Sequence, residues 1–194
     1  MKYEKTLLEF LKNNFGYITT SDFLNLGINK PLINKFIEGG LIRKVGHGLY
    51  MDNNIIEDEY YILQKKYSDI IFSYNTALNM LNLTNRAPYS IDITACAGKT
   101  IKGDFNIHYV TKQNFDVGIL EVMSPYGNLV KVYNAERCIC DMLKKEKEFD
   151  LEQQNRVLNY YFNSKDKNLD RLLDYAKKFK VYDKVYTIMK VMMK

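Results

Sequence analysis

The 194-residue sequence has no tryptophan, only three cysteines and only two histidines, and each shortage narrows what the chain can be. Cys96, Cys138 and Cys140 are odd in number and absent from the first 95 residues, so they do not form a disulfide framework. Within a predicted helix, the spacing of Cys138 and Cys140 puts them on different faces and does not suit a zinc knuckle. We expect small buried apolar residues rather than a metal or redox site, and we predict no metal and no cofactor.

Long apolar runs are also missing. No segment reaches the roughly 18 consecutive apolar residues that a membrane span requires. The N-terminus, MKYEKTLLEFLKNN, carries a charge every few positions and lacks the apolar core of a signal peptide. The sequence therefore predicts a cytoplasmic protein with no membrane partner.

The motifs of common catalytic sites are absent. With only His47 and His108 available, no Ser-His-Asp set can be assembled, and there is no glycine-rich phosphate loop. Four acids flank predicted strands: Asp92, Asp104, Asp116 and Glu121. They lack the spacing of metal-dependent nucleases and of nucleotidyltransferases. We therefore expect no catalytic residues and a protein that is not an enzyme.

The sequence contains enough hydrophobic residues to form well-packed cores. Hydrophobic residues make up 46% of the chain, and 16 Tyr and 10 Phe supply the bulk. The length allows one large domain or two small ones. The formal net charge of +5 permits nucleic-acid binding without arguing for it alone.

The first 52 residues have the element order of a winged helix-turn-helix. Apolar stripes at helical spacing, N-cap residue types and glycine stops predict three helices, and two apolar runs around Gly46-His47-Gly48 predict a hairpin. The expected helices cover 3–14, 22–26 and 30–38, and the strands cover 41–45 and 49–51. Gly27 occupies the tight turn between the second and third helices.

The rest of the chain predicts a mixed α/β domain over residues 57–194. The acidic segment 52–59 is the best candidate for a linker. Expected helices cover 57–67, 73–83, 134–147, 151–162, 169–179 and 182–193, and expected strands cover 91–97, 106–111, 117–123 and 129–133. The fold class is thus α+β: a winged helix-turn-helix over 1–52, followed by a mixed α/β domain that ends in a helical segment.

The third predicted helix is the candidate reader of DNA, because the second helix of such a motif lies in the major groove. If Ile33, Phe36 and Ile37 face inward, the helical wheel turns three polar residues outward. These are Lys30, Asn34 and Lys35. Asparagine can pair with an adenine edge, and lysine with guanine or phosphate.

Further candidate contacts flank that helix. Thr19, Thr20 and Ser21 lie at a helix N-terminus, which is a natural phosphate site. The wing and its strand carry Arg43, Lys44 and His47. We predict that this surface binds double-stranded operator DNA. Winged helices also serve as protein-interaction modules, in which case these residues are only a solvated face.

Several blocks of the first half resemble the N-terminal domain of the AbiEi antitoxins of type IV, or abortive-infection, toxin–antitoxin systems of bacteria. The blocks are FGYITTSD at 15–22, LGI at 26–28, IEGGLIR at 37–43 and GHGLY at 46–50. In the second half, SYNTAL at 73–78 is similar to the family's Ser-x-x-(x)-Ala-Leu helix start. ERCICDML at 136–143 is similar to its Glu-Arg-Thr-Ile-x-Asp helix, with Cys138 in place of the usual Thr.

The resemblance implies two roles. The N-terminal domain would repress the protein's own operon, and the C-terminal domain would neutralise a nucleotidyltransferase-type toxin without forming a stable complex with it. Ser73, Glu136, Arg137 and Asp141 are the residues of the antitoxin-domain motif. From the helix spacing alone, Arg137 and Asp141 suggest an intrahelical ion pair worth a few tenths of a kcal/mol.

Two other functions stay open at the level of the sequence. The α/β half could be a nuclease or transferase that the winged helix delivers to nucleic acid. Alternatively, the chain could be a one-component transcription regulator whose α/β half binds a small ligand.

Overall fold

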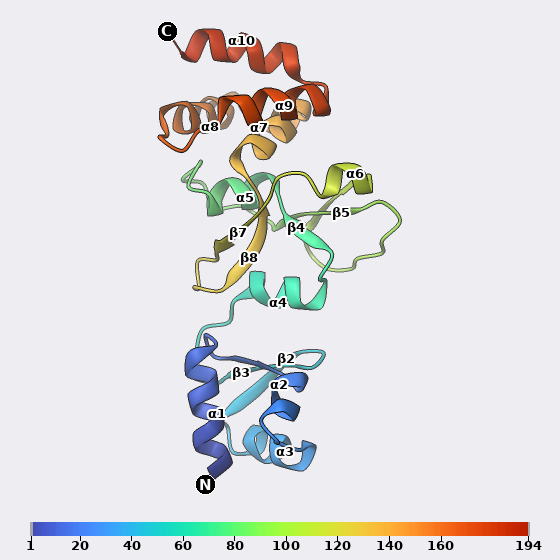
Figure 1. Cartoon of the computed structure of the whole chain (residues 1–194), viewed down its shortest axis with the longest axis vertical. Helices are drawn as coiled ribbons and strands as arrows, with labels where there is room; N and C mark the ends of the chain where they lie inside the picture. Colours follow the sequence, from blue (N-terminus) through green and yellow to red (C-terminus); the bar gives the residue numbers. More distant parts are fainter. Residues whose placement is uncertain (1, 194) are drawn as a thin grey trace. The chain divides into compact units, whose positions relative to one another are not determined.

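The computed structural model describes residues 2–193, which separate into two compact units (Figure 1). Unit 1 comprises the residues up to Ser68 together with 123–130, and unit 2 comprises 69–122 together with 131 onward. The fold is α+β, with helices and strands in both units, as the sequence predicts. Residues 1 and 194, at the outer ends of the two predicted domains, lie outside the described part. The predicted domain limits at 52 and 57 stay a prediction.

Unit 1 has the winged helix-turn-helix order. Its elements are α1 (Lys2–Asn13), β1 (Tyr17–Thr19), α2 (Thr20–Asn25), α3 (Lys30–Glu38), β2 (Ile42–Gly46), β3 (Leu49–Asp52) and α4 (Glu59–Lys66). The strands form an antiparallel sheet in the order β1-β3-β2. The sequence does not predict β1, because three residues are too few to show the alternation of a strand.

Two apolar clusters cover the two faces of this sheet. On one face, α1, α2 and α3 bury Leu7, Leu11, Phe23, Ile33 and Phe36 against the sheet. On the other face, Leu49 and Met51 pack with Tyr61 and Ile62 of α4. Because Ile33 and Phe36 are buried, the predicted inward face of α3 is confirmed.

Asp58 shows that the acidic segment is not an open linker along its whole length. This side chain is fully buried and caps α4 by accepting from the backbone N–H groups of Tyr60 and Tyr61. Its carboxylate also accepts from the Ser124 hydroxyl and, at 2.7 Å, from the Asn128 amide. These bonds explain why the hairpin tip 123–130 groups with unit 1, although the residues that flank it in sequence belong to unit 2.

Unit 2 is built on a mixed sheet in the order β6-β5-β4-β8-β7. Its strands are β4 (Ile70–Phe72), β5 (Asp92–Cys96), β6 (Asn106–Val110), β7 (Ile119–Met123) and β8 (Leu129–Tyr133), the last two of which reach into the hairpin tip. β4 pairs antiparallel with β5 and parallel with β8, while β5 pairs parallel with β6. The sequence does not predict β4, which is short and buried on both faces.

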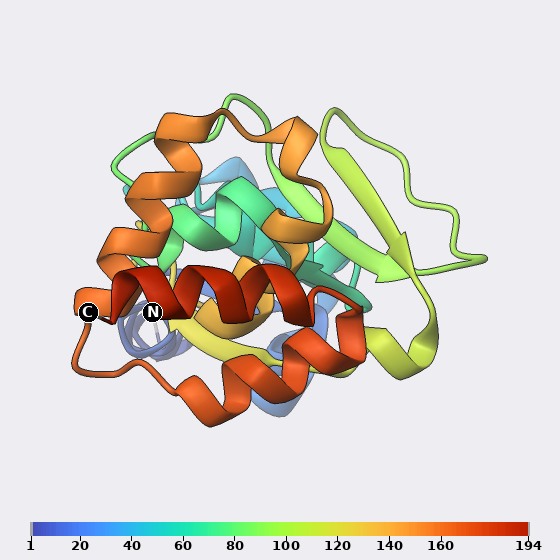
Figure 2. The same ribbon diagram turned by 90° about the horizontal axis from the view of Figure 1, so that it is seen from above.

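Unit 2 also contains helices, two between its strands and the others after the last strand. They are α5 (Tyr74–Met80), α6 (Lys112–Phe115), α7 (Ala135–Lys144), α8 (Leu151–Asn163), α9 (Leu169–Phe179) and α10 (Tyr182–Met192), with a 3-10 turn η1 (Glu146–Glu148). α7 packs against α5 on one side and against α8, α9 and α10 on the other (Figure 2). No described helix is long and apolar enough to cross a membrane.

Candidate nucleic-acid interface

The candidate reading helix α3 is fixed at both ends by its own sequence. Asn29 is the N-cap, and its side-chain oxygen accepts from the Leu32 N–H at 3.2 Å. Pro31 fits the first turn because its missing N–H would have no helical partner there. Gly39 is the C-cap. With its inner face buried, α3 is a rigid element that presents only its outer face.

That outer face carries the residues predicted from the helical wheel. Lys30, Asn34 and Lys35 are all exposed, so the predicted orientation of α3 is confirmed. Two cations and one amide can offer N–H donors to phosphate oxygens and base edges. Glu38 is the one acid that the described α3 exposes, and it lies at the C-terminal end.

The turn before α3 depends on a left-handed glycine. Gly27 has φ of +69°, and a Cβ there would meet no other atom within 4 Å. Glycine is therefore favoured here because it adopts a positive φ without strain, and not because a larger side chain would clash with a neighbour. A tight turn of this kind sets the angle between α2 and α3.

The start of α2 divides the three predicted hydroxyl contacts into two groups. Thr19 is the N-cap, and its hydroxyl and Asp22 form a capping box. Its hydroxyl is thus already engaged inside the protein. Thr20 and Ser21 are exposed in the first turn of α2, and the Thr20 hydroxyl donates to the Gly48 carbonyl.

The wing turn lies beside the start of α2. The Thr20 N–H donates to the Gly48 carbonyl at 2.8 Å. Gly48 has φ of +66°, and a Cβ there would come within 3.1 Å of the Thr20 hydroxyl oxygen. His47 is exposed at the tip of this turn. The start of α2 and the wing tip are therefore in direct contact, and both belong to unit 1 together with α3.

Arg43 and Lys44 lie next to each other on β2 but on opposite faces of the sheet. Arg43 is in register with Met51, which belongs to the cluster on the α4 face. Its guanidinium donates to Glu57 at 2.8 Å. Lys44 is in register with Tyr50, which packs on the α1–α3 face, and its side chain is exposed. The structure therefore groups Lys44, and not Arg43, with the residues of α3.

The predicted motif residues of unit 2 are buried and hold elements together. Ser73 precedes α5 at the N-cap position, but its side chain makes no cap hydrogen bond. Its hydroxyl instead accepts from the Thr94 hydroxyl of β5 at 2.9 Å. Ser73 therefore joins the start of α5 to β5 and does not cap the helix with its side chain.

Glu136 lies on α7 and is 2% exposed. Its carboxylate accepts from the Tyr161 hydroxyl and from the guanidinium of Arg171, which join α8 and α9 to α7. Burial, together with the nearby Glu136 charge, raises the pKa of the Tyr161 phenol, so this hydroxyl stays a donor at neutral pH.

Arg137 and Asp141 form a buried ion pair, which corrects the weak surface pair expected from spacing alone. Arg137 Nε donates to Asp141 at 2.7 Å, and both side chains are nearly inaccessible. The guanidinium also donates to the Asn114 carbonyl and lies between the rings of Tyr133 and Phe179. Removing one partner would leave a buried charge unpaired, so this pair matters far more than an exposed one.

The two buried cysteines agree with the sequence prediction. Cys138 and Cys140 are buried in α7, and burial raises the pKa of both thiols, that of Cys140 to about 12. Within residues 2–193, no group of histidine, cysteine and acidic side chains has the arrangement of a metal site.

Together these features define a winged helix-turn-helix unit and an α+β unit in one chain. Residues 5–51 match the family model described as "Transcriptional regulator, AbiEi antitoxin". This match confirms the resemblance recognised in the first half of the sequence. The N-terminal unit is thus similar to the regulator module that this family model describes.

Comparison with solved structures gives a fold relative. The chain is similar to the "RV2827C protein from Mycobacterium tuberculosis", with a TM-score of 0.61 and 12% sequence identity. The similarity covers 90% of this chain and 70% of that chain, so it includes both units. At this identity it shows the fold alone. No curated protein matches the chain.

Proposed function

We propose that this protein is an antitoxin that represses its own operon by binding operator DNA through unit 1. The proposed partner of the second role is a nucleotidyltransferase-type toxin, which unit 2 opposes without a stable complex. The DNA contacts would come from Lys30, Asn34 and Lys35 of α3, with Thr20, Ser21, Lys44 and His47 beside them.

The observation that carries the proposal is the outer face of α3. A rigid helix that follows a glycine turn and exposes two lysines and an asparagine has the chemistry of a recognition helix. The match to a family of transcriptional regulators over residues 5–51 supports the same role. The toxin partner rests on the resemblance of the second half to the family's motifs.

DNA binding is tested by fluorescence anisotropy with a duplex from the protein's own promoter and a scrambled duplex. Lys30→Ala combined with Lys35→Ala should weaken binding to both duplexes and lower the salt-dependence slope by about two units. The matched control is Lys65→Ala with Lys66→Ala on α4, which removes the same charge from exposed positions on the other face of the sheet. Equal losses in the two double variants would refute the assignment of α3.

Antitoxin activity is tested separately by co-expressing the full chain with a nucleotidyltransferase-type toxin encoded beside it and scoring growth; the absence of such a neighbouring gene would itself count against the antitoxin role. We expect growth to be rescued, and we expect Asn34→Ala to rescue growth while relieving promoter repression. Failure of rescue with intact operator binding would refute the antitoxin role and leave the repressor role in place.

A further inference from the structure

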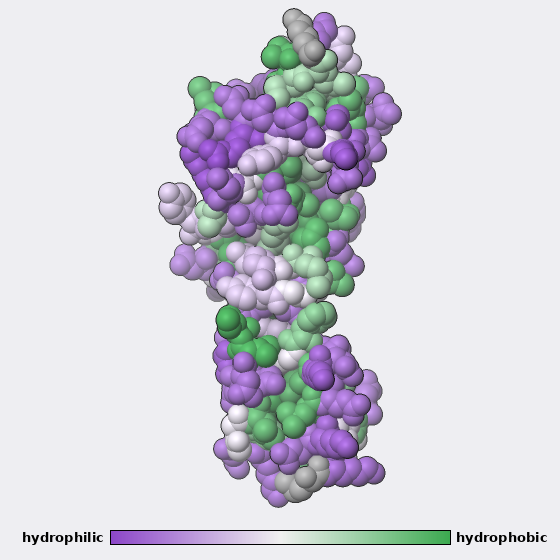
Figure 3. Space-filling view, turned by 90° about the vertical axis from the view of Figure 1, so that its left-hand side faces the viewer, coloured by the Kyte–Doolittle hydropathy of each residue, from purple (hydrophilic) through white to green (hydrophobic). Residues whose placement is uncertain are grey.

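Unit 1 contains an open apolar hollow of about 580 Å³, formed by the C-terminal half of α1, the segment after β3 and the hairpin tip 123–130. Apolar side chains gather on the α1 face of this unit (Figure 3). Four large apolar residues of the hollow stay exposed: Leu8, Phe15, Ile56 and Tyr126. The volume lies within the range of small-molecule sites, which are mostly apolar with a few polar groups.

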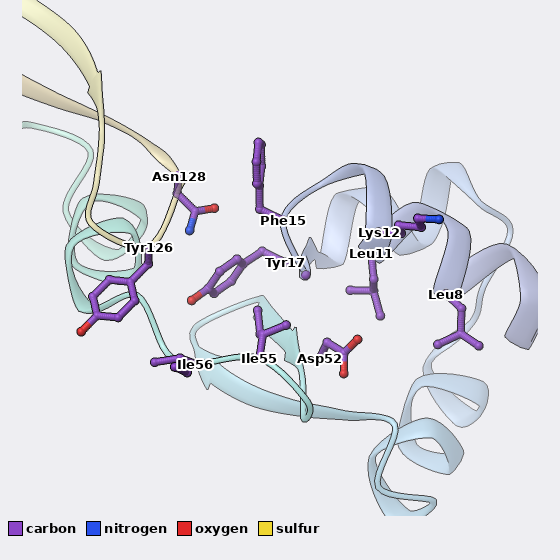
Figure 4. Close-up of a pocket in the computed structure, with 11 residues that line it drawn as sticks. Leu8, Leu11, Lys12, Phe15, Tyr17, Asp52, Ile55, Ile56, Tyr126 and Asn128 are labelled. Carbon is purple, nitrogen blue, oxygen red and sulfur yellow. The ribbon is translucent and has the colours of Figure 1, made fainter.

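Phe15 is held in a backbone conformation that its side chain disfavours. Its φ is +52°, in the left-handed region, and its side chain is 57% exposed. A glycine would adopt this conformation without steric cost. Because the ring contributes little to the core, the strained position is not explained by packing within unit 1. The ring borders the hollow beside Tyr17 (Figure 4).

The polar side chain of Asn128 also lines the hollow. Asn128 is only 3% exposed, and its amide nitrogen donates to Asp58. Its amide oxygen points toward the hollow in Figure 4 and accepts no hydrogen bond from the described residues. An amide oxygen has two lone pairs, so it can accept from an N–H or O–H group of an occupant. The hollow therefore favours an occupant with an N–H or O–H group.

The two charged residues that line the hollow, Asp52 and Lys12, also favour an occupant with a hydrogen-bond donor. Asp52 lines it with one carboxylate oxygen engaged by Asn54 and the other without a partner in the described chain. Lys12 lines it with the apolar part of its side chain, and its amino group points away from Tyr17 (Figure 4).

We propose that this hollow binds a small aromatic amine. The aromatic body lies against the rings of Phe15, Tyr17 and Tyr126, where a cationic head group also gains cation–π attraction. The amine donates to the Asn128 oxygen or to Asp52. This site does not depend on the DNA-binding proposal, because it is defined by contacts within unit 1 that lie away from the outer face of α3.

The absence of tryptophan provides a direct assay. Tryptamine is a fluorescent aromatic amine, and the full chain contributes no indole signal of its own. We expect saturable one-to-one binding with a blue shift of the indole emission. Indole-3-propionate, which has the same ring and an anionic head group, should bind about tenfold more weakly.

Two variants test the two halves of the site. Phe15→Gly removes the ring and relieves the left-handed strain, so the melting temperature should not fall while tryptamine affinity falls about tenfold. Asp52→Asn should reduce the preference for tryptamine over indole-3-propionate. Leu24→Ala is the control, since Leu24 is 70% exposed on α2 and does not line the hollow.

Three results would overturn the proposal. The first is the absence of saturable tryptamine binding, and the second is an equal loss of affinity in Leu24→Ala. The third is a dimer, seen by sedimentation, that Phe15→Gly disperses and tryptamine does not affect. That outcome would assign the hollow to a second copy of the chain.

Discussion

Lys44 and Arg43 provide a paired test of where DNA lies on unit 1, because two adjacent cations on β2 face opposite sides of one sheet. Lys44 is exposed on the α1–α3 face, whereas Arg43 points to the α4 face and pairs with Glu57. Each is changed singly to Gln, which removes one charge and keeps a polar side chain. If DNA lies along α3, only Lys44→Gln removes a phosphate contact.

The magnitude follows from counterion release. One lost phosphate contact lowers the slope of log affinity against log salt by about 0.9. Between about 50 mM and about 200 mM salt, the affinity of Lys44→Gln should therefore fall about 3.5-fold less than that of the unaltered protein. Arg43→Gln should leave the slope unchanged and reduce stability by no more than about 1 kcal/mol, because its ion pair with Glu57 is exposed.

The assay is an anisotropy titration of both variants on the promoter duplex at four or more salt concentrations. Urea unfolding of each variant shows whether the domain stays folded. A reduced slope in Arg43→Gln with an unchanged slope in Lys44→Gln would place DNA on the α4 face and refute the recognition role of α3. Unchanged slopes in both variants would mean that β2 does not approach the DNA backbone.

Three further predictions concern other parts of the chain. Asn34→Ala should cost roughly 1–3 kcal/mol on the promoter duplex and much less on the scrambled one, since a base contact is lost; an unchanged affinity ratio would exclude a base contact. Arg137→Met should lower the free energy of unfolding in urea by about 3–5 kcal/mol, because a buried carboxylate loses its cation; a loss under about 1 kcal/mol would contradict this. Among the cysteines, Cys96 should react first with a thiol reagent at neutral pH. Cys138 and Cys140 should react only on unfolding, because burial raises their pKa values and suppresses the thiolate; fast labelling of all three would show that α7 opens readily.

The sequence by itself determined the local elements of unit 1. Helical stripes, capping residues and left-handed glycines act within a few positions, so they predict α1, α2, α3 and the hairpin from short windows. The outward orientation of Asn34 and Lys35 follows from the same periodicity, because a helix with a buried stripe has only one inner face. The family resemblance of the first half rests on these same short blocks.

The tertiary structure decided which distant groups meet. β1 and β4 are three residues long, and only their pairing with β3, β5 and β8 makes them strands. The face on which Arg43 lies depends on its register with Met51. Sequence spacing predicts that Arg137 and Asp141 are neighbours, but the surrounding rings of Tyr133 and Phe179 decide that the pair is buried.

The hollow in unit 1 is the clearest case. Its wall includes Phe15 and Asn128, which are more than a hundred positions apart, and Asp58 holds the hairpin tip in place by accepting from Asn128. No local pattern marks these residues, because each has an ordinary neighbourhood in the sequence. Burial and hydrogen bonding between remote segments depend on how the whole chain packs, so only the folded structure brings them together.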